Sequence, residues 1–544
     1  MNLFLNEKNN IVTEAIDGLV RSSSGRLSRL DGFPHIRVVT RSDWDKSKVA
    51  LISGGGSGHE PAHAGFVGRG MLTAAVCGDV FASPSVDAVL AGILAVTGPA
   101  GCLLIVKNYT GDRLNFGLAA ERAKSMGLKV SMVIVDDDIA LPDLPQPRGL
   151  AGTLFVHKIA GRLAENGKSL EEITAAANSV IARAKTISMS LDTCNVPGSP
   201  KSDRIPEGRA ELGLGIHGEV GIEQIEFKNA KDAMSMVADR LAREAAEGDL
   251  VVLLNNLGGA SALEMSVLSH ELINSSLSSR IKWMVGPGSL MTSLDMKGFS
   301  VTAFSAKSEE LEHLNAKVDI SAWPGCNEVT SVDLKDLPDG LKPERPNPSE
   351  DPETRKFLQE CCRVLIDSES DLNALDSYSG DGDTGSTLAG AAKSLIQNLD
   401  RLPFANHSQL LKALGLELSE SMGGSSGVLL AIFFASAGDA ATNGASLHHA
   451  LQKGLEQLQE VGGAKSGDRS MVDALGPGLE ALEKSLADAA RAARQGANET
   501  AGMSKAKVGR ATYIGAEQLT GHVDPGAEAV ARIFEHLAKG RKAD

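Results

Sequence analysis

The sequence predicts an N-terminal α/β domain, built from two α/β subdomains, followed by a C-terminal all-α domain. At 544 residues the chain is too long for one hydrophobic core. From about residue 10 to 330, short apolar runs alternate with segments of helical spacing, which is the α/β pattern. From 357 to 540 the chain is rich in Ala, Leu and Gly, with helical spacing and no convincing strand.

A proline-rich segment separates the two domains. It holds five prolines and shows no apolar period. We therefore expect a linker over 334–356, between domains at 1–333 and 357–544.

The composition is that of a globular protein, with 42% hydrophobic and 23% charged residues. A net charge of −15 argues against a nucleic-acid partner, because affinity for phosphate backbones depends on cationic residues. The N-terminus lacks a signal-peptide pattern, and no run approaches the ~18 apolar residues of a membrane span. The six cysteines lack metal-site spacing and read as reduced thiols. We expect a cytoplasmic protein with no nucleic-acid or membrane partner.

Four apolar runs of the first domain end in Gly, Asn or Asp and are predicted to be buried strands. Ligands in α/β folds gather at the carboxyl ends of strands. The runs are KVALISGGG (48–56), AGCLLIVKNYTGD (100–112), LKVSMVIVDDD (128–138) and GDLVVLLNNLGG (248–259). Residues 150–190 read as two helices split at Asn166 and Gly167, with Ser169 and Glu172 as a capping box.

Three short motifs suggest functions that their context does not support. HEPAH (59–63) has zinc-protease spacing, but Pro61 is not tolerated inside a helix, so His59 and His63 are not expected to share a metal. GLGIHG (213–218) fits GxGxxG, yet no buried strand is predicted over the preceding PEGRAEL. GRLAENGKS (161–169) misses the P-loop spacing by one residue. No Walker-type nucleotide site is visible in the sequence, so if ATP binds, the loops of the helical domain are the candidates.

Two glycine-rich loops of the first domain each carry a histidine. SGGGSGHEPAHAGFVG places His59 after a strand, and ELGLGIHGEVG places His217 between two glycines. A lone loop histidine is more often an incidental surface residue, but a glycine-rich turn at a strand end leaves room for a ligand. Lys107 and Asp112 add a cation and a carboxylate to the same predicted rim. These groups could hold and activate a small polyol or carbonyl compound.

An acidic loop stands between two segments of helical spacing in the second domain. ALDSYSGDGDTGSTL (374–388) brings together Asp376, Asp381 and Asp383. Clustered carboxylates repel one another, so a cation usually holds them ionised, and small hydroxyl and Gly neighbours suit Mg²⁺ shared with phosphate oxygens. A plain surface turn is the alternative, since Asp and Gly dominate turns. An EF-hand is excluded by the missing closing Glu. Phosphoryl transfer is the leading hypothesis.

Taken together, and in this order, the motifs resemble those of the single-chain ATP-dependent dihydroxyacetone kinases, also called glycerone or triose kinases. GGGSGHEPAH, VKNYTGD and GIHGE are similar to the family's ketone-binding K domain. GDGDTGST, GGSSG, GDRSMVD, GRATYIG and HVDPGA are similar to its nucleotide-binding L domain, an antiparallel helical barrel. The resemblance covers nearly the whole chain, and the set is specific although no single motif is.

For the first domain, the resemblance implies a ketone held covalently as a hemiaminal on His217. A neutral imidazole is nucleophilic and a ketone electrophilic, so glycerol, which lacks the carbonyl, should be refused. His59 and Asp112 would hydrogen-bond the substrate, with Asp112 as the base for the attacking hydroxyl. Gly56 and Lys107 would line the pocket.

For the second domain, the resemblance implies two Mg²⁺ ions on the ATP phosphates, held by Asp376, Asp381 and Asp383. The remaining motif residues would contact the phosphates or close round the nucleotide. They are Thr384, Gly385, Ser386, Thr387, Ser425, Ser426, Gly462, Met471, Arg510, Asp524, Pro525 and Gly526.

The fusion of both domains favours ATP as an exchanging substrate, because relatives that use phosphoenolpyruvate carry K and L as separate chains. Family members are homodimers, and a homodimer is expected here. Dihydroxyacetone is the expected substrate, with glyceraldehyde as a second one. The alternatives are a kinase for a four-carbon ketose such as erythrulose, an additional lyase activity that cyclises FAD, and a regulatory protein that only senses the ketone. The last predicts loss of the metal ligands or of the covalent histidine, and this chain keeps them.

Overall fold

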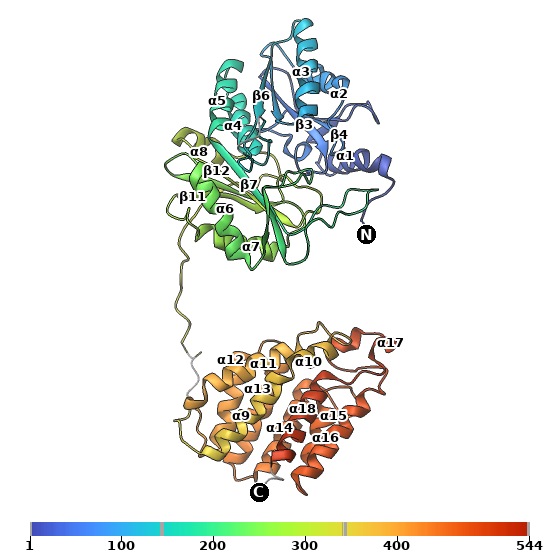
Figure 1. Cartoon of the computed structure of the whole chain (residues 1–544), viewed down its shortest axis with the longest axis vertical. Helices are drawn as coiled ribbons and strands as arrows, with labels where there is room; N and C mark the ends of the chain where they lie inside the picture. The colour runs from blue at the N-terminus through green and yellow to red at the C-terminus, as the bar shows by residue number, and fades with distance from the viewer. Residues whose placement is uncertain (1–2, 142–145, 340, 342–344, 541–544) are drawn as a thin grey trace. The chain divides into compact units, whose positions relative to one another are not determined.

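The computed structural model describes residues 3–141, 146–339, 341 and 345–540. The chain divides into two compact units, Met1–Asp333 and Leu334–Asp544 (Figure 1). The first is α/β and the second is helical, as the sequence predicts. Within the described ranges, none of the helices has both the length and the apolarity that crossing a bilayer requires.

A six-stranded sheet forms the first half of the N-terminal unit, in the order β1-β2-β4-β3-β5-β6. Strands β4, β3, β5 and β6 pair in parallel, and β1 and β2 extend the sheet antiparallel. Three of the predicted strands are found here, as β3, β5 and β6. The bounds are β1 Leu27–Arg29, β2 Val38–Arg41, β3 Ala50–Ser57, β4 Ala74–Val80, β5 Cys102–Lys107 and β6 Val130–Val135.

A seven-stranded sheet forms the second half, in the order β13-β11-β10-β12-β7-β8-β9. Only the β10–β11 pair among these strands is parallel. The fourth predicted strand is β10. The bounds are β7 Ala184–Ser190, β8 Arg209–Leu212, β9 Glu223–Glu226, β10 Leu250–Asn256, β11 Ile281–Gly288, β12 Gly298–Phe304 and β13 Cys326–Glu328.

Helices cover both sheets and fill the space between them (Figure 1). Helices α2 and α3 pack on the outer face of the first sheet, and α6 and α7 on the outer face of the second. Helix α4 lies in the core shared by the two sheets, and eleven of its 13 residues are buried. The bounds are α1 Ile11–Arg21, α2 Val86–Val96, α3 Thr110–Ser125, α4 Thr153–Glu165, α5 Leu170–Arg183, α6 Ala230–Glu244, α7 Ala262–Ile273 and α8 Ser308–Asn315.

Two local expectations in this unit are corrected. The helical region predicted over 150–190 ends at Arg183, and AKTISMS is strand β7, where β-branched and small residues pair with β12. PEGRAEL contains strand β8, which pairs with β7 on one side and with β9 on the other. Its charged residues do not have the pattern of a buried strand, so the sequence did not predict it. The capping box is confirmed, since Ser169 and Glu172 bond reciprocally at the start of α5.

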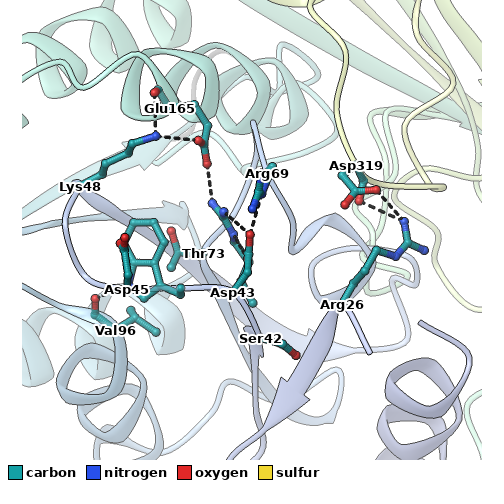
Figure 2. A network of polar contacts seen from close by, with 12 residues as sticks. Arg26, Ser42, Asp43, Asp45, Lys48, Arg69, Thr73, Val96, Glu165 and Asp319 are labelled. Atoms are coloured by element: carbon teal, nitrogen blue, oxygen red, sulfur yellow. Dashed lines mark hydrogen bonds and ion pairs between the residues drawn. The ribbon is translucent and has the colours of Figure 1, made fainter. Parts of the chain in front are cut away.

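A polar network joins the start of the chain to later segments of the same unit (Figure 2). Asp43 accepts from Arg69, and Lys48 donates to the side chain and the carbonyl of Glu165 at the end of α4. Arg26 pairs with Asp319 across 3.0 Å. Exposed ion pairs contribute only ~0–1 kcal/mol each, so the exposed pairs of this network add little to stability.

The C-terminal unit consists of helices α9 to α18 in the residues that the structure describes. Helix α9 begins at Pro352, inside the predicted linker, because Asp351 caps its first turn and proline fits the first helical position. The bounds are α9 Pro352–Asp367, α10 Glu369–Asp376, α11 Thr384–Gln397, α12 His407–Ser421, α13 Gly424–Thr442, α14 Leu447–Gly462, α15 Val472–Ala481, α16 Leu486–Thr500, α17 Ala516–Leu519 and α18 Pro525–Gly540.

Candidate active site

The two loop histidines of the N-terminal unit meet at the carboxyl end of β3. Nε2 of His59 lies 3.1 Å from Nε2 of His217, although 158 positions separate them. Nδ1 of His59 lies 2.8 Å from the carbonyl oxygen of Thr292, so this nitrogen carries a hydrogen and donates it. His59 is fully buried, and burial together with the charge of Lys107 places its pKa well below the usual 6.5. The ring is therefore neutral at pH 7.

Lys107 and Asp112 lie beside the same glycine strand. Lys107 ends β5, Asp112 stands in the first turn of α3, and both are buried. Gly55 has a φ of +148°, which other residues adopt only with strain, and a Cβ added there would come within 3.2 Å of Asp112 Oδ2 and 3.5 Å of Lys107 Nζ. In the described part of the chain, Lys107 Nζ and Asp112 Oδ1 have no hydrogen-bond partner. Two buried polar atoms without partners next to a glycine strand suit a small hydroxylated ligand.

The pKa values of these two groups move toward the neutral forms. Burial lowers the pKa of Lys107, and nearby carboxylates, Asp112 first, oppose the shift. Burial also raises the pKa of Asp112, although Lys107 opposes it. A carboxyl group with a raised pKa is a stronger base when ionised, so Asp112 is suited to accept a proton from a hydroxyl.

Three groups around His217 were not identified from the sequence. Glu219 holds the ring through Nδ1, with Oε1 at 3.1 Å, and its Oε2 accepts the backbone N–H of His217 at 3.0 Å. The rings of Tyr109 and Phe81 stand edge-on to the imidazole, with centroids 4.5 and 5.2 Å away. The GIHGE motif contains Glu219, but the sequence does not indicate that its carboxylate bonds the His217 ring.

A cavity of about 270 Å³ lies on the other side of the glycine strand, under α1. Gly56, Glu60 and His63 line it together with apolar residues of α1, whereas His59, Lys107, Asp112 and His217 do not. Gly56 thus lines this cavity, and it lies just before the loop that carries His59. His63 Nδ1 lies 3.0 Å from His157 Nε2, whereas His59 Nε2 lies 3.1 Å from His217, so the two histidines of HEPAH have different partners.

The three aspartates of the acidic loop converge in the C-terminal unit. One oxygen from each of Asp376, Asp381 and Asp383 can be chosen so that all lie within 4.8 Å of one another. Asp376 is buried and its Oδ2 accepts the backbone N–H groups of Asp383 and Thr384, at 3.0 and 3.1 Å. A Cβ on Gly380 would lie 2.4 Å from Asp376 Oδ1. An all-carboxylate donor set with one anchored member and two exposed members fits Mg²⁺ shared with a ligand.

The start of α11 is held against α10 by tight packing. A Cβ on Gly385 would lie 2.1 Å from the carbonyl oxygen of Glu369. Asn373 donates to Ser386 Oγ and accepts the Ser386 N–H, at 2.8 and 3.0 Å. The N–H of Thr387 donates to the carbonyl oxygen of Asp383 at 2.9 Å. These contacts fix the turn that carries the acidic loop.

Residues near the C-terminal end of the sequence contact the same loop. Arg510 forms an ion pair with Asp381, and His522 stacks on Tyr378 with ring centroids 3.7 Å apart. Asp524 caps α18 by accepting the N–H of Ala527, with Pro525 as the first helical residue. Contacts with the acidic loop therefore connect three parts of the expected nucleotide site. They are residues 384–387, which follow the loop, Arg510, which pairs with Asp381, and the 524–526 turn, which follows His522.

The other expected nucleotide residues are placed less directly. Gly526 lies beside Met471, since an added Cβ would come within 3.3 Å of Met471 Cβ. Gly462 ends α14 against Leu429 of α13. The side chains of Ser425 and Ser426 lie outside the described part of the structure.

Comparisons with known proteins match both units. Residues 17–322 match the Dak1 domain model, and residues 378–539 match the DAK2 domain model. The chain is 48% identical to a dihydroxyacetone kinase of Citrobacter freundii, with 98% of this chain and 99% of that protein covered. It is 40% identical to a triokinase/FMN cyclase of Mus musculus, with 96% of each covered. The crystal structure of the C. freundii kinase with AMP-PNP and Mg²⁺ covers 99% of both chains, at 45% identity and a TM-score of 0.66.

Proposed function

Because the chain belongs to the dihydroxyacetone kinase family, with a Dak1 and a DAK2 domain in one polypeptide, we propose that it transfers the γ-phosphoryl group of ATP to dihydroxyacetone. Glyceraldehyde is the second expected substrate. The observation that carries the proposal is the pairing of a buried, glycine-lined histidine site with a three-carboxylate loop in one chain. The first site suits a small carbonyl compound and the second suits a phosphate-bound cation.

The ketone is held as a hemiaminal on Nε2 of His217. Glu219 occupies Nδ1, which leaves Nε2 as the ring atom that faces His59. His59 is neutral, and its Nε2 lies at hydrogen-bond distance from the His217 ring. It can therefore form a hydrogen bond with the substrate once the ketone is bonded to His217. Selection then depends on the presence of a carbonyl group, and glycerol is not captured.

Asp112 accepts the proton of the hydroxyl that attacks phosphorus. Its carboxyl group lies at the strand edge that also carries Lys107, and Lys107 offsets the negative charge. Phosphoryl transfer requires mainly positioning and charge stabilisation from a protein. Asp112 as the base and Lys107 as the cation therefore suffice on the side of the attacking hydroxyl.

Asp376, Asp381 and Asp383 are the residues that would hold Mg²⁺, two ions being expected, together with ATP. When bound, Mg²⁺ offsets the charge of the phosphate oxygens and orients the γ-phosphoryl group. The N–H groups at the start of α11 and the Arg510 guanidinium orient the phosphates, and the 524–526 turn encloses the nucleotide. The AMP-PNP and Mg²⁺ complex of the C. freundii kinase supports ATP and Mg²⁺ as the ligands.

The protein acts as a homodimer in the cytoplasm, in line with the family resemblance. Light scattering coupled to size exclusion tests the dimer, for which a mass near 57 kDa would be the contrary result, since the chain itself is 56.8 kDa.

The decisive test of ketone capture is a crystal soaked with dihydroxyacetone, combined with a coupled assay of ATP-dependent triose phosphate formation. We expect continuous density from His217 Nε2 to the ketone carbon, and turnover with dihydroxyacetone but not with glycerol. A ketone bound without a bond to His217, or equal turnover of glycerol, would refute capture through the carbonyl.

A cyclising lyase activity on FAD is the second candidate, because the Mus musculus relative is a triokinase/FMN cyclase. This reaction would use the metal and phosphate site of the C-terminal unit alone. Incubation with FAD and Mn²⁺ in the absence of any ketose, followed by chromatography, tests for a cyclic flavin phosphate.

A further inference from the structure

Glu219 grips His217 at two points. Its Oε1 lies 3.1 Å from Nδ1 of the ring, and its Oε2 accepts the backbone N–H of the same residue at 3.0 Å. A carboxylate only accepts hydrogen bonds, so Nδ1 must carry the hydrogen. The nucleophile is the neutral form of the ring, in which the lone pair resides on Nε2, the nitrogen that faces His59.

The carboxylate of Glu219 is itself held in place. A Cβ on Gly215 would lie 2.0 Å from Glu219 Oε2 and 2.9 Å from Arg148 Nη1, so this glycine lets both groups approach the loop backbone. Arg148 is buried, and it donates to Asp138 at 2.6 Å and to the carbonyl of Gly213 at 2.7 Å. The loop that carries His217 is thus fixed at the carbonyl of Gly213 by Arg148, which forms a buried ion pair with Asp138.

Glu219 stays ionised in this setting. Burial raises its pKa, but the hydrogen bonds from the ring and the backbone N–H of His217, together with the positive charge of the ring when it is protonated, lower the pKa to about 2. The carboxylate is therefore ionised at pH 7 and faces the Nδ1 edge of the imidazole.

We propose that Glu219 is the positioning residue that fixes the His217 tautomer and stabilises the charge of the captured ketone, an inference that rests on the proposed capture at His217. When the Nε2 lone pair bonds to the carbonyl carbon, the C=O π pair moves onto oxygen, which takes one proton from solvent. The ring keeps its Nδ1 hydrogen and is left with one positive charge. That charge faces Glu219, so the carboxylate favours the adduct over the free ketone.

The test is ketone affinity, measured by calorimetry on the full-length protein without ATP. Glu219→Gln keeps the side-chain size and one acceptor but removes the charge, and Glu219→Ala removes both. We expect affinity for dihydroxyacetone to fall ~10- to 100-fold in the Gln variant, as for the loss of one hydrogen bond to a charged group, and further in the Ala variant. Glu219→Asp should recover part of the loss. The KM for ATP should stay unchanged.

Glycerol separates positioning from a merely structural role, because it cannot form the adduct. Its weak affinity should be the same in wild type and Glu219→Gln. Glu211→Gln is the matched control, since Glu211 is buried in the same hairpin and bonds Arg204 and the Gly221 N–H rather than His217. This variant should retain ketone affinity.

The outcomes distinguish the inference from the proposed function. If the wild-type soak shows no bond to His217, capture itself is refuted. If wild type forms the bond but Glu219→Gln binds dihydroxyacetone equally well, capture stands and the role of Glu219 is refuted. If the Gln variant loses glycerol and dihydroxyacetone affinity equally, or if Glu211→Gln loses as much, Glu219 is only structural and the inference fails.

Discussion

The two candidate sites differ in how their charged groups are kept in place. In the N-terminal unit, His59, Lys107 and Asp112 are at most 3% exposed, and burial moves their pKa values toward neutral forms. In the C-terminal unit, the side chain of Asp381 is half exposed and only Asp376 is anchored by backbone N–H groups. Under the proposed function, the first site would receive a small neutral molecule, whereas the second would use a cation to offset the repulsion among its carboxylates. Variants of each site should therefore fail in different ways.

The largest effect is expected at the acidic loop. Asp381→Ala removes one of three converging carboxylates, and phosphoryl transfer should fall by ~10³-fold or more because positioning by the metal is most of the catalysis. Ketone affinity, measured by calorimetry, should be unchanged. Asp371→Ala is the control, since Asp371 is an exposed carboxylate of α10 that pairs with Arg532. Full turnover by the Asp381 variant would exclude it as a metal ligand.

The base of the buried site should show in the pH profile. Because burial raises the pKa of Asp112, the acid limb of kcat/KM should lie above the ordinary 3.8 of an aspartate. Activity falls as the pH drops through this raised pKa, since a protonated carboxyl group cannot accept the hydroxyl proton. Asp112→Asn should lower kcat ~10²- to 10³-fold and abolish that limb. An unchanged acid limb in the Asn variant would assign the limb to another group.

Loss of the residue proposed to bind the ketone covalently should weaken the use of one substrate only. His217→Ala should lower kcat/KM for dihydroxyacetone by ~10²-fold, because an uncaptured ketone is poorly positioned for transfer. The KM for ATP should not change. His35→Ala replaces an exposed histidine of the same unit and should behave as wild type. A parallel loss of ATP affinity in His217→Ala would show that the two sites are not separate in function.

Local pattern sufficed wherever one segment determines the geometry. The strands β3, β5, β6 and β10, the capping box of α5 and the helices on either side of the acidic loop follow from periodicity and cap residues. The convergence of Asp376, Asp381 and Asp383 also follows, because eight consecutive positions contain all three.

Contacts made across the fold could not be predicted in the same way. His59 is oriented by the carbonyl of Thr292, 233 positions away, and a backbone carbonyl leaves no trace in the residue type. Strand β8 escaped detection because its pairing with β7 and β9, rather than its own letters, makes it a strand. The reach of Glu219 back to His217 depends on Gly215, whose missing side chain gives the carboxylate its place. The sequence thus led to the proposed reacting groups, but not to the groups that orient them in the structure.

The smallest effect sharpens the comparison through stability. If backbone packing positions the acidic loop, Gly385→Ala should destabilise the C-terminal unit by ~1–3 kcal/mol, because the new Cβ would lie 2.1 Å from the Glu369 carbonyl. Gly390→Ala, in the same helix with nothing within 4 Å of its Cβ, should instead stabilise by up to ~1 kcal/mol. Scanning calorimetry of the full-length protein measures both. Opposite signs would show that a tight α10–α11 contact sets the loop, and equal stabilisation by both changes would mean that the carboxylates depend on the cation alone for their arrangement.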